Sequence, residues 1–200
     1  MEIGQTRLRT STTHFAPSTI AYIVVFSALA IVLHIFQYPF PLAPWLKFDL
    51  AGVPLTILSL ISLKLGGIGF TIFWVGSLLL TTDPTRVIGP SMKTIAEAST
   101  ALPFAYIYKR SKGQQESLKT IVIGFAIALA SRVLIMLLLN YIVAPYWLVW
   151  ARWMKTLEDA YRFTITYLPF NALFNAIVVC YVVPIAAAIW KSVKKYILPS

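Results

Sequence analysis

Residues 18–38, STIAYIVVFSALAIVLHIFQY, form an apolar stretch that contains no Lys, Arg, Asp or Glu. A helix needs about 20 predominantly apolar residues to cross the hydrocarbon core of a bilayer, and this stretch is long enough. Residues 28–30 (ALA) resemble a signal-peptide cleavage site, but the apolar run continues through them, which favours a retained helix. We therefore expect this stretch to be the first membrane-spanning helix.

Five further apolar segments follow: residues 50–63, 68–82, 88–108, 120–143 and 165–190. The glycines of residues 66–69 (GGIG) separate the second segment from the third, and we interpret them as a turn between two short helices. With 58% hydrophobic and 12% charged residues, the chain carries about half the charge of a soluble domain. The sequence predicts an all-α integral membrane protein, with a polar tail (1–17) before one domain (18–195) of six transmembrane helices.

Six helices place both termini on one side of the membrane, and the basic residues indicate which side. The side of the termini holds ten of them: Arg7, Arg9, Lys64, Lys109, Arg110, Lys112, Lys119, Lys191, Lys194 and Lys195. The opposite side holds six: Lys47, Arg86, Lys93, Arg152, Lys155 and Arg162. Because cytoplasmic loops carry the excess of Lys and Arg, we expect cytoplasmic termini in a bacterial or archaeal cell membrane. The net charge of +10 is then a property of membrane topology, and no nucleic acid partner is expected.

Two ionisable residues, Glu97 and Arg132, lie well inside the predicted helices. Counted from Lys109 and Lys119 at the cytoplasmic helix ends, they reach nearly the same depth. An isolated charge there costs at least about 2.5–3.5 kcal/mol. We therefore expect an ion pair between adjacent helices, either structural or beside a polar ligand site. Lys93, one turn before Glu97, is an alternative partner for that carboxylate.

Three amides lie in the outer halves of the predicted helices: Asn140, Asn171 and Asn175. Asn171 and Asn175 are one turn apart and share a helix face. Amides both donate and accept, so they suit the polar edge of a heterocycle, but they also join neighbouring membrane helices. Both interpretations stay open.

Three prolines within six residues exclude a helix from residues 39–49 and favour an extended loop. In this loop Trp45 either stacks on a flat ligand or anchors at the membrane interface. Lys47 either contacts a ligand or faces lipid headgroups, and Asp49 either contacts a ligand or caps the next helix. Residues 145–163 carry three tryptophans at a spacing of three, which fits an interfacial amphipathic helix or a lid over a pocket.

The sequence contains no motif that carries enzymatic chemistry. P-loop, H-E-x-x-H and G-x-S-x-G patterns are absent, and the two His residues lack the partners of a metal site. A chain of intramembrane acids, typical of proton-driven carriers, is also absent. We expect no enzyme, no resident cofactor and no metal site.

Five short motifs, in order, resemble the substrate-binding (S) subunits of energy-coupling factor (ECF) transporters of the riboflavin type. The longest, residues 40–54 (FPLAPWLKFDLAGVP), resembles the Pro-rich first loop and the start of the second helix. The others are residues 66–69 (GGIG), 102–103 (LP), 138–141 (LLNY) and 168–171 (LPFN). The resemblance spans about residues 20–195.

The resemblance implies a six-helix subunit that binds a vitamin near the outer surface, covered by the first loop. Such subunits pass the vitamin inward with a membrane coupling (T) subunit and two ATPase subunits, which agrees with the absent P-loop. Riboflavin is the ligand expected first. The expected substrate-binding residues are Trp45, Lys47, Asp49, Lys93, Asn140, Asn171 and Asn175. A standalone secondary carrier and a ligand-free scaffold remain as alternatives.

Two departures from the riboflavin-type pattern concern the ligand. The family's Phe-Asn-x-x-Lys motif on the sixth helix has Phe174 at the Lys position here, and Lys93 stands on the fourth helix where Asn is common. Another vitamin therefore stays open. Ser27, Ala28 and Ala30 lie where the family's Ala-x-x-x-Ala face contacts the coupling subunit, although the strict spacing is absent.

Overall fold

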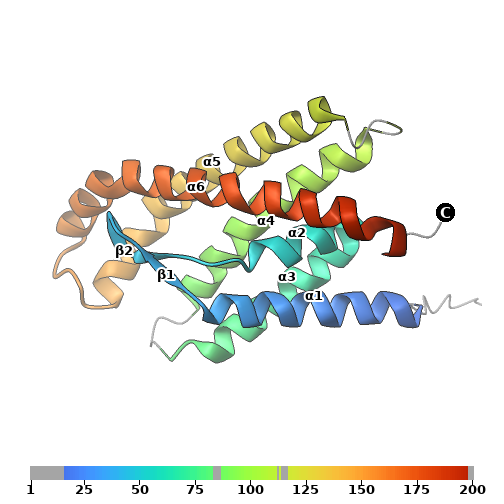
Figure 1. Ribbon diagram of the computed structural model, residues 1–200. Coiled ribbons are helices and arrows are strands. Elements are labelled where there is room, and N and C mark those ends of the chain that lie inside the picture. The colour runs from blue at the N-terminus through green and yellow to red at the C-terminus, as the bar shows by residue number, and fades with distance from the viewer. Residues whose placement is uncertain (1–15, 83–86, 112, 114–116, 198–200) are drawn as a thin grey trace, which may run out of the picture.

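The computed structural model describes residues 16–82, 87–111, 113 and 117–197, and in them the chain forms six helices and one two-stranded hairpin (Figure 1). The helices are α1 (Pro17–Ile35), α2 (Gly52–Ile61), α3 (Leu63–Leu80), α4 (Ile88–Arg110), α5 (Leu118–Trp150) and α6 (Leu157–Ile197). The strands are β1 (Tyr38–Phe40) and β2 (Ala43–Phe48). Nearly all of the predicted polar tail lies outside the described residues.

Four helices, α1, α3, α5 and α6, are long and apolar enough to cross a membrane. α4 has 23 residues but carries charged side chains along its length, and α2 has only 10 residues. Ten helical residues rise about 15 Å, half of the hydrocarbon core, so α2 alone cannot cross it. The six helices predicted from the sequence are present among the described residues, while length and composition mark four of them as candidate spans.

α2 is the central helix of the bundle. Every residue from Gly52 to Leu60 is buried, and the helix contacts α1, α3, α4 and α6. Residues 61–63, at its C-terminal end, are half-buried, and unpaired carbonyl groups there are costly. Lys109 of α4 donates from Nζ to the carbonyl oxygen of Ile61 at 2.8 Å and so satisfies one of them.

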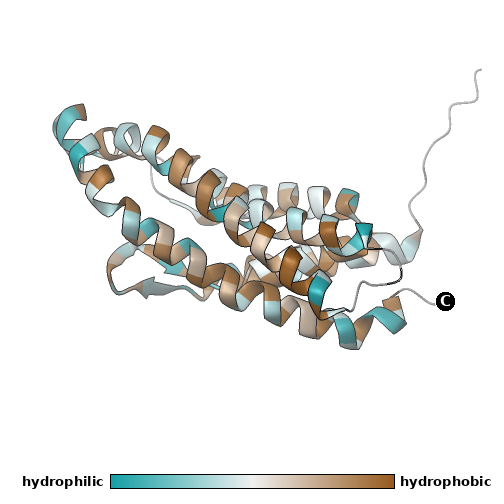
Figure 2. Ribbon diagram, turned by 90° about the horizontal axis from the view of Figure 1, so that it is seen from above, coloured by the Kyte–Doolittle hydropathy of each residue, from teal (hydrophilic) through white to brown (hydrophobic). Residues whose placement is uncertain are grey.

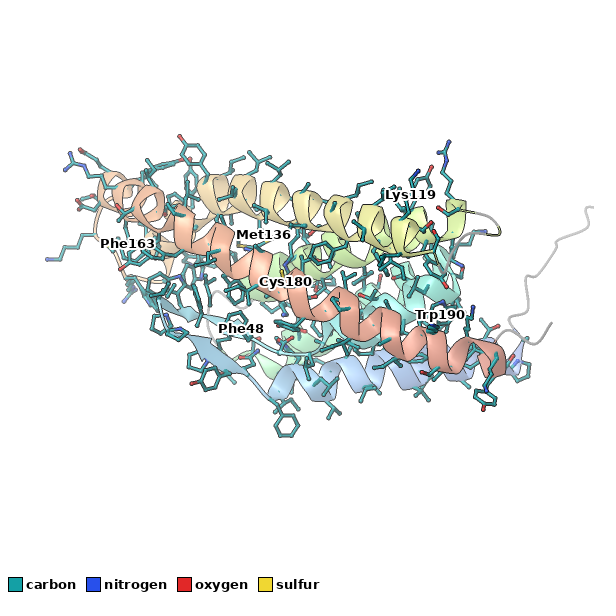
Figure 3. The ribbon with its side chains drawn as sticks, turned by 45° about the horizontal axis from the view of Figure 1, so that its top comes forward. Phe48, Lys119, Met136, Phe163, Cys180 and Trp190 are labelled. Atoms are coloured by element: carbon teal, nitrogen blue, oxygen red, sulfur yellow. The ribbon has the colours of Figure 1, made fainter. Side chains whose placement is uncertain are left out.

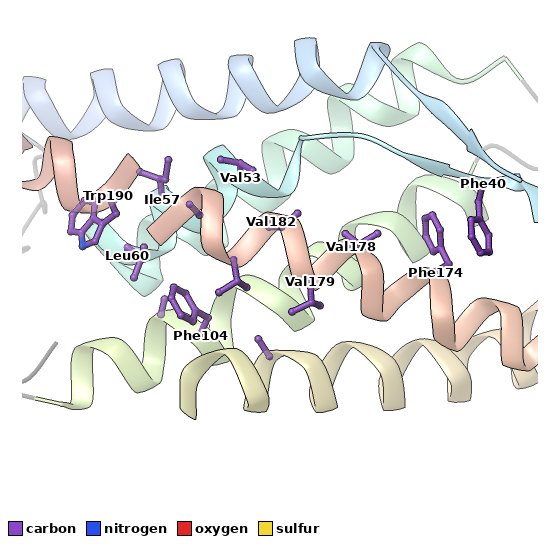
Figure 4. Close-up of a cluster of buried hydrophobic side chains, with 14 of the residues drawn as sticks. Phe40, Val53, Ile57, Leu60, Phe104, Phe174, Val178, Val179, Val182 and Trp190 are labelled. Atoms are coloured by element: carbon purple, nitrogen blue, oxygen red, sulfur yellow. The ribbon is translucent and has the colours of Figure 1, made fainter. Parts of the chain in front are cut away.

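The main hydrophobic core lies between α6 and the helices that face it. Figure 4 shows Val178, Val179 and Val182 of α6 packed towards Phe104 of α4 and Ile57 of α2. Apolar residues also lie on the outside of the bundle, and Leu79 is 82% exposed. Figure 2 shows hydrophobic residues along the length of the helices. Helices that are apolar on all sides are typical of a protein embedded in lipid.

The predicted glycine turn at residues 66–69 is wrong. α3 already begins at Leu63, and the break from α2 is the single extended residue Ser62. Gly66 and Gly69 lie inside α3, on the side that faces Ser59 and Leu58 of α2. The glycines therefore permit close packing of two helices, a role that glycine also has in membrane proteins.

The predicted connection at residues 144–164 is mostly helical. α5 continues through Pro145 to Trp150, and α6 begins at Leu157, so that residues 151–156 alone are non-helical. Thr156 accepts a hydrogen bond from the backbone N–H of Asp159 at 3.1 Å, which caps the start of α6. A Thr followed three residues later by an acid is a sequence signal for such a cap, and it predicts a helix start at this point.

Residues 38–48 form an antiparallel hairpin, so the all-α prediction is wrong at this point. Tyr38 pairs with Phe48, and Pro39 pairs with Lys47. A two-stranded sheet has only edge strands, where a residue without an N–H is tolerated. In Figure 1 the hairpin lies at one end of the bundle, whereas α1 begins and α6 ends at the other. We call these the hairpin end and the terminal end.

Candidate functional site

A cavity of about 360 Å³ lies at the hairpin end, between the hairpin, α4, α5 and α6. Small-molecule sites commonly measure about 300–1,000 Å³. The seven side chains expected to bind a substrate all line it: Trp45, Lys47, Asp49, Lys93, Asn140, Asn171 and Asn175. Phe163 and Met136, labelled in Figure 3, line the same cavity from α6 and α5.

Aromatic rings close the cavity where the hairpin meets α6. The Trp45 ring lies 4.8 Å from that of Tyr167 and 5.4 Å from that of Phe163. Nearer to α2, the Phe48 ring stacks on that of Phe174 at 4.8 Å, with an interplanar angle of 28°. Aromatic side chains therefore hold the hairpin against α6, over one side of the cavity.

Asp49, directly after β2, joins three elements through its carboxylate. Oδ1 lies 3.0 Å from Lys93 Nζ of α4 and accepts the Ala51 N–H at 3.0 Å, while Oδ2 lies 2.9 Å from His34 Nδ1 of α1. Burial by itself raises the pKa of Asp49, but the Lys93 ammonium and the hydrogen bond to His34 outweigh it, so the pKa lies below its ordinary value of 3.8. Asp49 therefore fixes the base of the hairpin to α1 and α4.

The predicted ion pair between Glu97 and Arg132 is confirmed. Glu97 Oε2 lies 3.2 Å from Arg132 Nη1, and Glu97 Oε1 accepts from Arg132 Nη2 at 3.3 Å. Lys93, the alternative partner, joins as well, with Nζ at 2.7 Å from Glu97 Oε1. The Oε2 contact is an ion pair by distance without hydrogen-bond alignment, and a Cβ added at Gly52 would collide with this oxygen.

Arg132 extends the network to α6. Its Nε donates to Asn175 Oδ1 at 2.9 Å, and its Nη1 donates to Thr100 Oγ1 at 3.0 Å and to the Ala96 carbonyl at 3.2 Å. Asn175 Nδ2 in turn donates to Asn171 Oδ1 at 3.0 Å. The amide of Asn175 is therefore used within the protein, whereas Asn171 lines the cavity and uses only its oxygens in these hydrogen bonds.

The two carboxylates of the network are more deeply buried than Lys93 and His34. The side chains of Asp49 and Glu97 are 1% exposed, whereas those of Lys93 and His34 are 17% and 15% exposed. The cavity presents ammonium and amide N–H donors, which suit a ligand rich in hydrogen-bond acceptors.

Two functional positions could not be read from helical spacing. His34 meets Asp49 because the hairpin returns the chain to the end of α1, and Tyr181 donates from its hydroxyl to the Asp49 carbonyl at 2.7 Å.

The three residues of the predicted coupling face on α1 differ in exposure. Ser27 and Ala30 are buried against α2 and α3, while Ala28 is exposed, so only Ala28 of the three lies on the outer surface.

A family model described as the substrate-specific component of ECF transporters matches residues 18–187. The chain therefore belongs to this family. One solved structure, described as the S component of a bacterial ECF transporter, matches with a TM-score of 0.72 at 21% identity, over 90% of this chain and 97% of that one. At this identity the match shows a shared fold. No curated protein sequence matches the chain.

Membership defines the class of protein. Substrate-specific components are multi-pass cell membrane proteins that bind a substrate and work with the coupling and ATPase modules of ECF transporters. They are binding and transport proteins rather than enzymes. This chain accordingly serves as the substrate-binding component of such a transporter.

Proposed function

We propose that this chain captures a vitamin from outside the cell in the cavity at the hairpin end, and that the vitamin is riboflavin. The observation that carries the proposal is the convergence of seven side chains from the hairpin, α4, α5 and α6 on one cavity. The sequence predicts each of them as a substrate-binding residue, from its chemistry and from the resemblance to riboflavin-type subunits.

The walls of the cavity match the flat ring system of a flavin and the polar edge of that ring system. The rings of Trp45, Tyr167 and Phe163 provide an aromatic wall for a flat heterocycle. Lys93 Nζ and Asn171 Nδ2 provide donors for the carbonyl oxygens and ring nitrogens along the polar edge of that heterocycle.

The departure at Phe174 is compatible with this ligand. Phe174 lines the cavity where riboflavin-type subunits carry a Lys, and Lys93 lines the same cavity from α4. A cation is thus available to the cavity from a different helix. Phe174 instead stacks on Phe48 and supports the hairpin.

The orientation in the membrane follows from the same proposal. Residues at the hairpin end face the outside, and both termini face the cytoplasm, where a coupling subunit and two ATPase subunits drive release. Asn140 donates one N–H of Nδ2 to the Met136 carbonyl at 2.7 Å, and we infer that its Oδ1 and its second N–H serve a ligand.

The visible absorption spectrum of the detergent-purified protein from flavin-replete cells, followed by mass spectrometry of the extracted ligand, tests the proposal. We expect a yellow protein with stoichiometric riboflavin, and an Asn171→Leu variant of equal yield that is colourless. A protein that purifies with a different vitamin keeps the substrate-binding role and removes riboflavin. Ligand uptake without any ATPase module would instead favour the standalone carrier.

A further inference from the structure

Thr164 of α6 is a buried hydroxyl that the charge network does not use. Its residue is 6% exposed, it lines the cavity, and its Oγ1 has no hydrogen-bond partner among the described residues. A buried polar atom without a partner destabilises a folded protein. Such an atom at the wall of a cavity points to a partner that is not part of the chain.

Other hydroxyls in these helices bond to the carbonyl four residues before them. Thr56 donates to Gly52, Ser59 to Leu55, and Thr166, two residues beyond Thr164, to Arg162 at 2.9 Å. This back-bonding is the usual solution for Ser and Thr in membrane helices. Thr164 does not adopt it, so its hydroxyl forms no hydrogen bond within the described residues, although the residue lines the cavity.

The position of Thr164 relative to the network suggests what it contacts. Thr164 and Asn171 are seven residues apart on α6, which is two turns, so they share a face at about 10 Å along the helix axis. Tyr167 lies between them, against the Trp45 ring. The cavity therefore presents a polar level, an aromatic level and a second polar level in sequence.

We propose that Thr164 is a specificity-determining residue that hydrogen-bonds the hydroxylated side chain of the ligand, while the polar edge of the ring lies at Asn171 and Lys93. This inference rests on the proposed function, because the hydroxylated chain is the ribityl group of riboflavin. Hydroxyl groups both donate and accept, so a Thr hydroxyl can pair with a polyol in either sense. The aromatic level between the two polar levels then holds the ring.

Two flavins and two variants test the inference. Lumiflavin has the same ring as riboflavin but a methyl group in place of the ribityl chain. Thr164→Val removes the hydroxyl at nearly constant volume, and Thr166→Val does the same at the exposed, back-bonded neighbour. Each flavin is titrated with ligand-free protein in detergent, and the quenching of flavin fluorescence gives the dissociation constant of the complex. The Tm of each ligand-free variant is measured as well.

We expect Thr164→Val to weaken riboflavin binding by roughly three- to tenfold and to leave lumiflavin binding unchanged. Thr166→Val changes neither. The Tm of ligand-free Thr164→Val should equal or exceed that of the wild type, since the lost hydroxyl has no partner to release. A lowered Tm with equal losses for both flavins assigns Thr164 a structural role and overturns the inference.

Two further outcomes separate this inference from the proposed function. If Thr164→Val binds riboflavin as tightly as the wild type, the Thr164 assignment is wrong while the riboflavin proposal stands. If the wild type binds neither flavin, riboflavin is not the ligand, and the Thr164 assignment to a ribityl chain is overturned with it.

Discussion

At the scale of single residues, charge dominates the hairpin end of the bundle. Arg132 is 1% exposed and pairs with Glu97, which is equally buried. We predict that Arg132→Met lowers the free energy of unfolding by about 3–5 kcal/mol, because a buried carboxylate loses its main partner. Thermal unfolding of the detergent-purified protein measures the effect.

The same bundle supplies a matched control for Arg132. Arg162 pairs with Glu158 at 2.6 Å, but both side chains are 75% exposed, and Arg162→Met should change stability by less than about 1 kcal/mol. Glu97→Gln combined with Arg132→Met should recover part of the loss. Wild-type stability of Arg132→Met together with lost ligand binding would assign the pair to the ligand rather than to the fold.

Acid should weaken the protein through Asp49. Because the pKa of Asp49 is lower in the folded protein than its ordinary value of 3.8, the stabilisation from its ionised form is complete above that value and is lost as the pH falls below it. We expect the Tm of the wild type to fall from about pH 4 to about pH 3 more steeply than that of Asp49→Asn, which cannot titrate. Parallel slopes for the two proteins would show that Asp49 contributes nothing to the acid transition.

The ion pair was predictable, and the His34 contact was not, for one physical reason. Depth along two straight helices follows from counting residues, so Glu97 and Arg132 could be matched from Lys109 and Lys119 alone. His34 meets Asp49 only because the hairpin reverses the chain between them. No spacing rule connects residues across such a reversal.

At the scale of elements, the glycines of α3 carry the contact with α2. A Cβ on Gly66 would collide with the side chain of Ser59 and approach its Cα, whereas a Cβ on Gly67 would meet nothing within 4 Å. We predict that Gly66→Ala destabilises by about 1–3 kcal/mol and that Gly67→Ala is neutral or stabilising by up to about 1 kcal/mol. The Tm values of the two variants measure the effect. Equal values would contradict a packing role for Gly66 against α2.

We predict that the hairpin controls access to the cavity. Trp45 contacts Tyr167 and Phe163 of α6, so a ligand that passes between the hairpin and α6 would have to open this aromatic contact. We predict that Trp45→Ala raises the dissociation rate of riboflavin several-fold, up to about tenfold. Tyr38 of the same hairpin is 69% exposed, and Tyr38→Ala should leave the dissociation rate unchanged. Stopped-flow fluorescence measures both rates, and an unchanged rate for Trp45→Ala would contradict a covering role.

Element type was predictable where a single strong rule applied and not where two rules competed. Pro39, Pro41 and Pro44 excluded a helix, and the structure has none there, yet they did not reveal that the extended chain folds back into two strands. Glycine can end a helix, and it can also let two helices pack closely. Gly66 was predicted to end a helix, but it lies inside α3 and packs against α2. A neighbouring helix, not local sequence, decides between those two uses.

At the scale of the whole molecule, the fold has a charge asymmetry along its long axis. Among the described residues, the basic side chains at the terminal end are Lys64, Lys109, Arg110, Lys119, Lys191, Lys194 and Lys195, since they lie at the helix ends found there (Figure 1). Those at the hairpin end are Lys47, Lys93, Arg152, Lys155 and Arg162. Two of the latter, Lys93 and Arg162, pair with acids inside the protein. Because Lys and Arg are in excess at the terminal end, we predict that this end faces the cytoplasm.

Cysteine labelling in intact cells tests this orientation. The single native cysteine, Cys180, is exposed and is first replaced by Ser. Lys155→Cys places a thiol in the exposed loop at the hairpin end, and Lys191→Cys places one on an exposed position near the terminal end. A membrane-impermeant maleimide should modify position 155 in intact cells and position 191 only after lysis, because the cavity must open outward to capture a vitamin. The reverse pattern would place the cavity in the cytoplasm and exclude capture from outside.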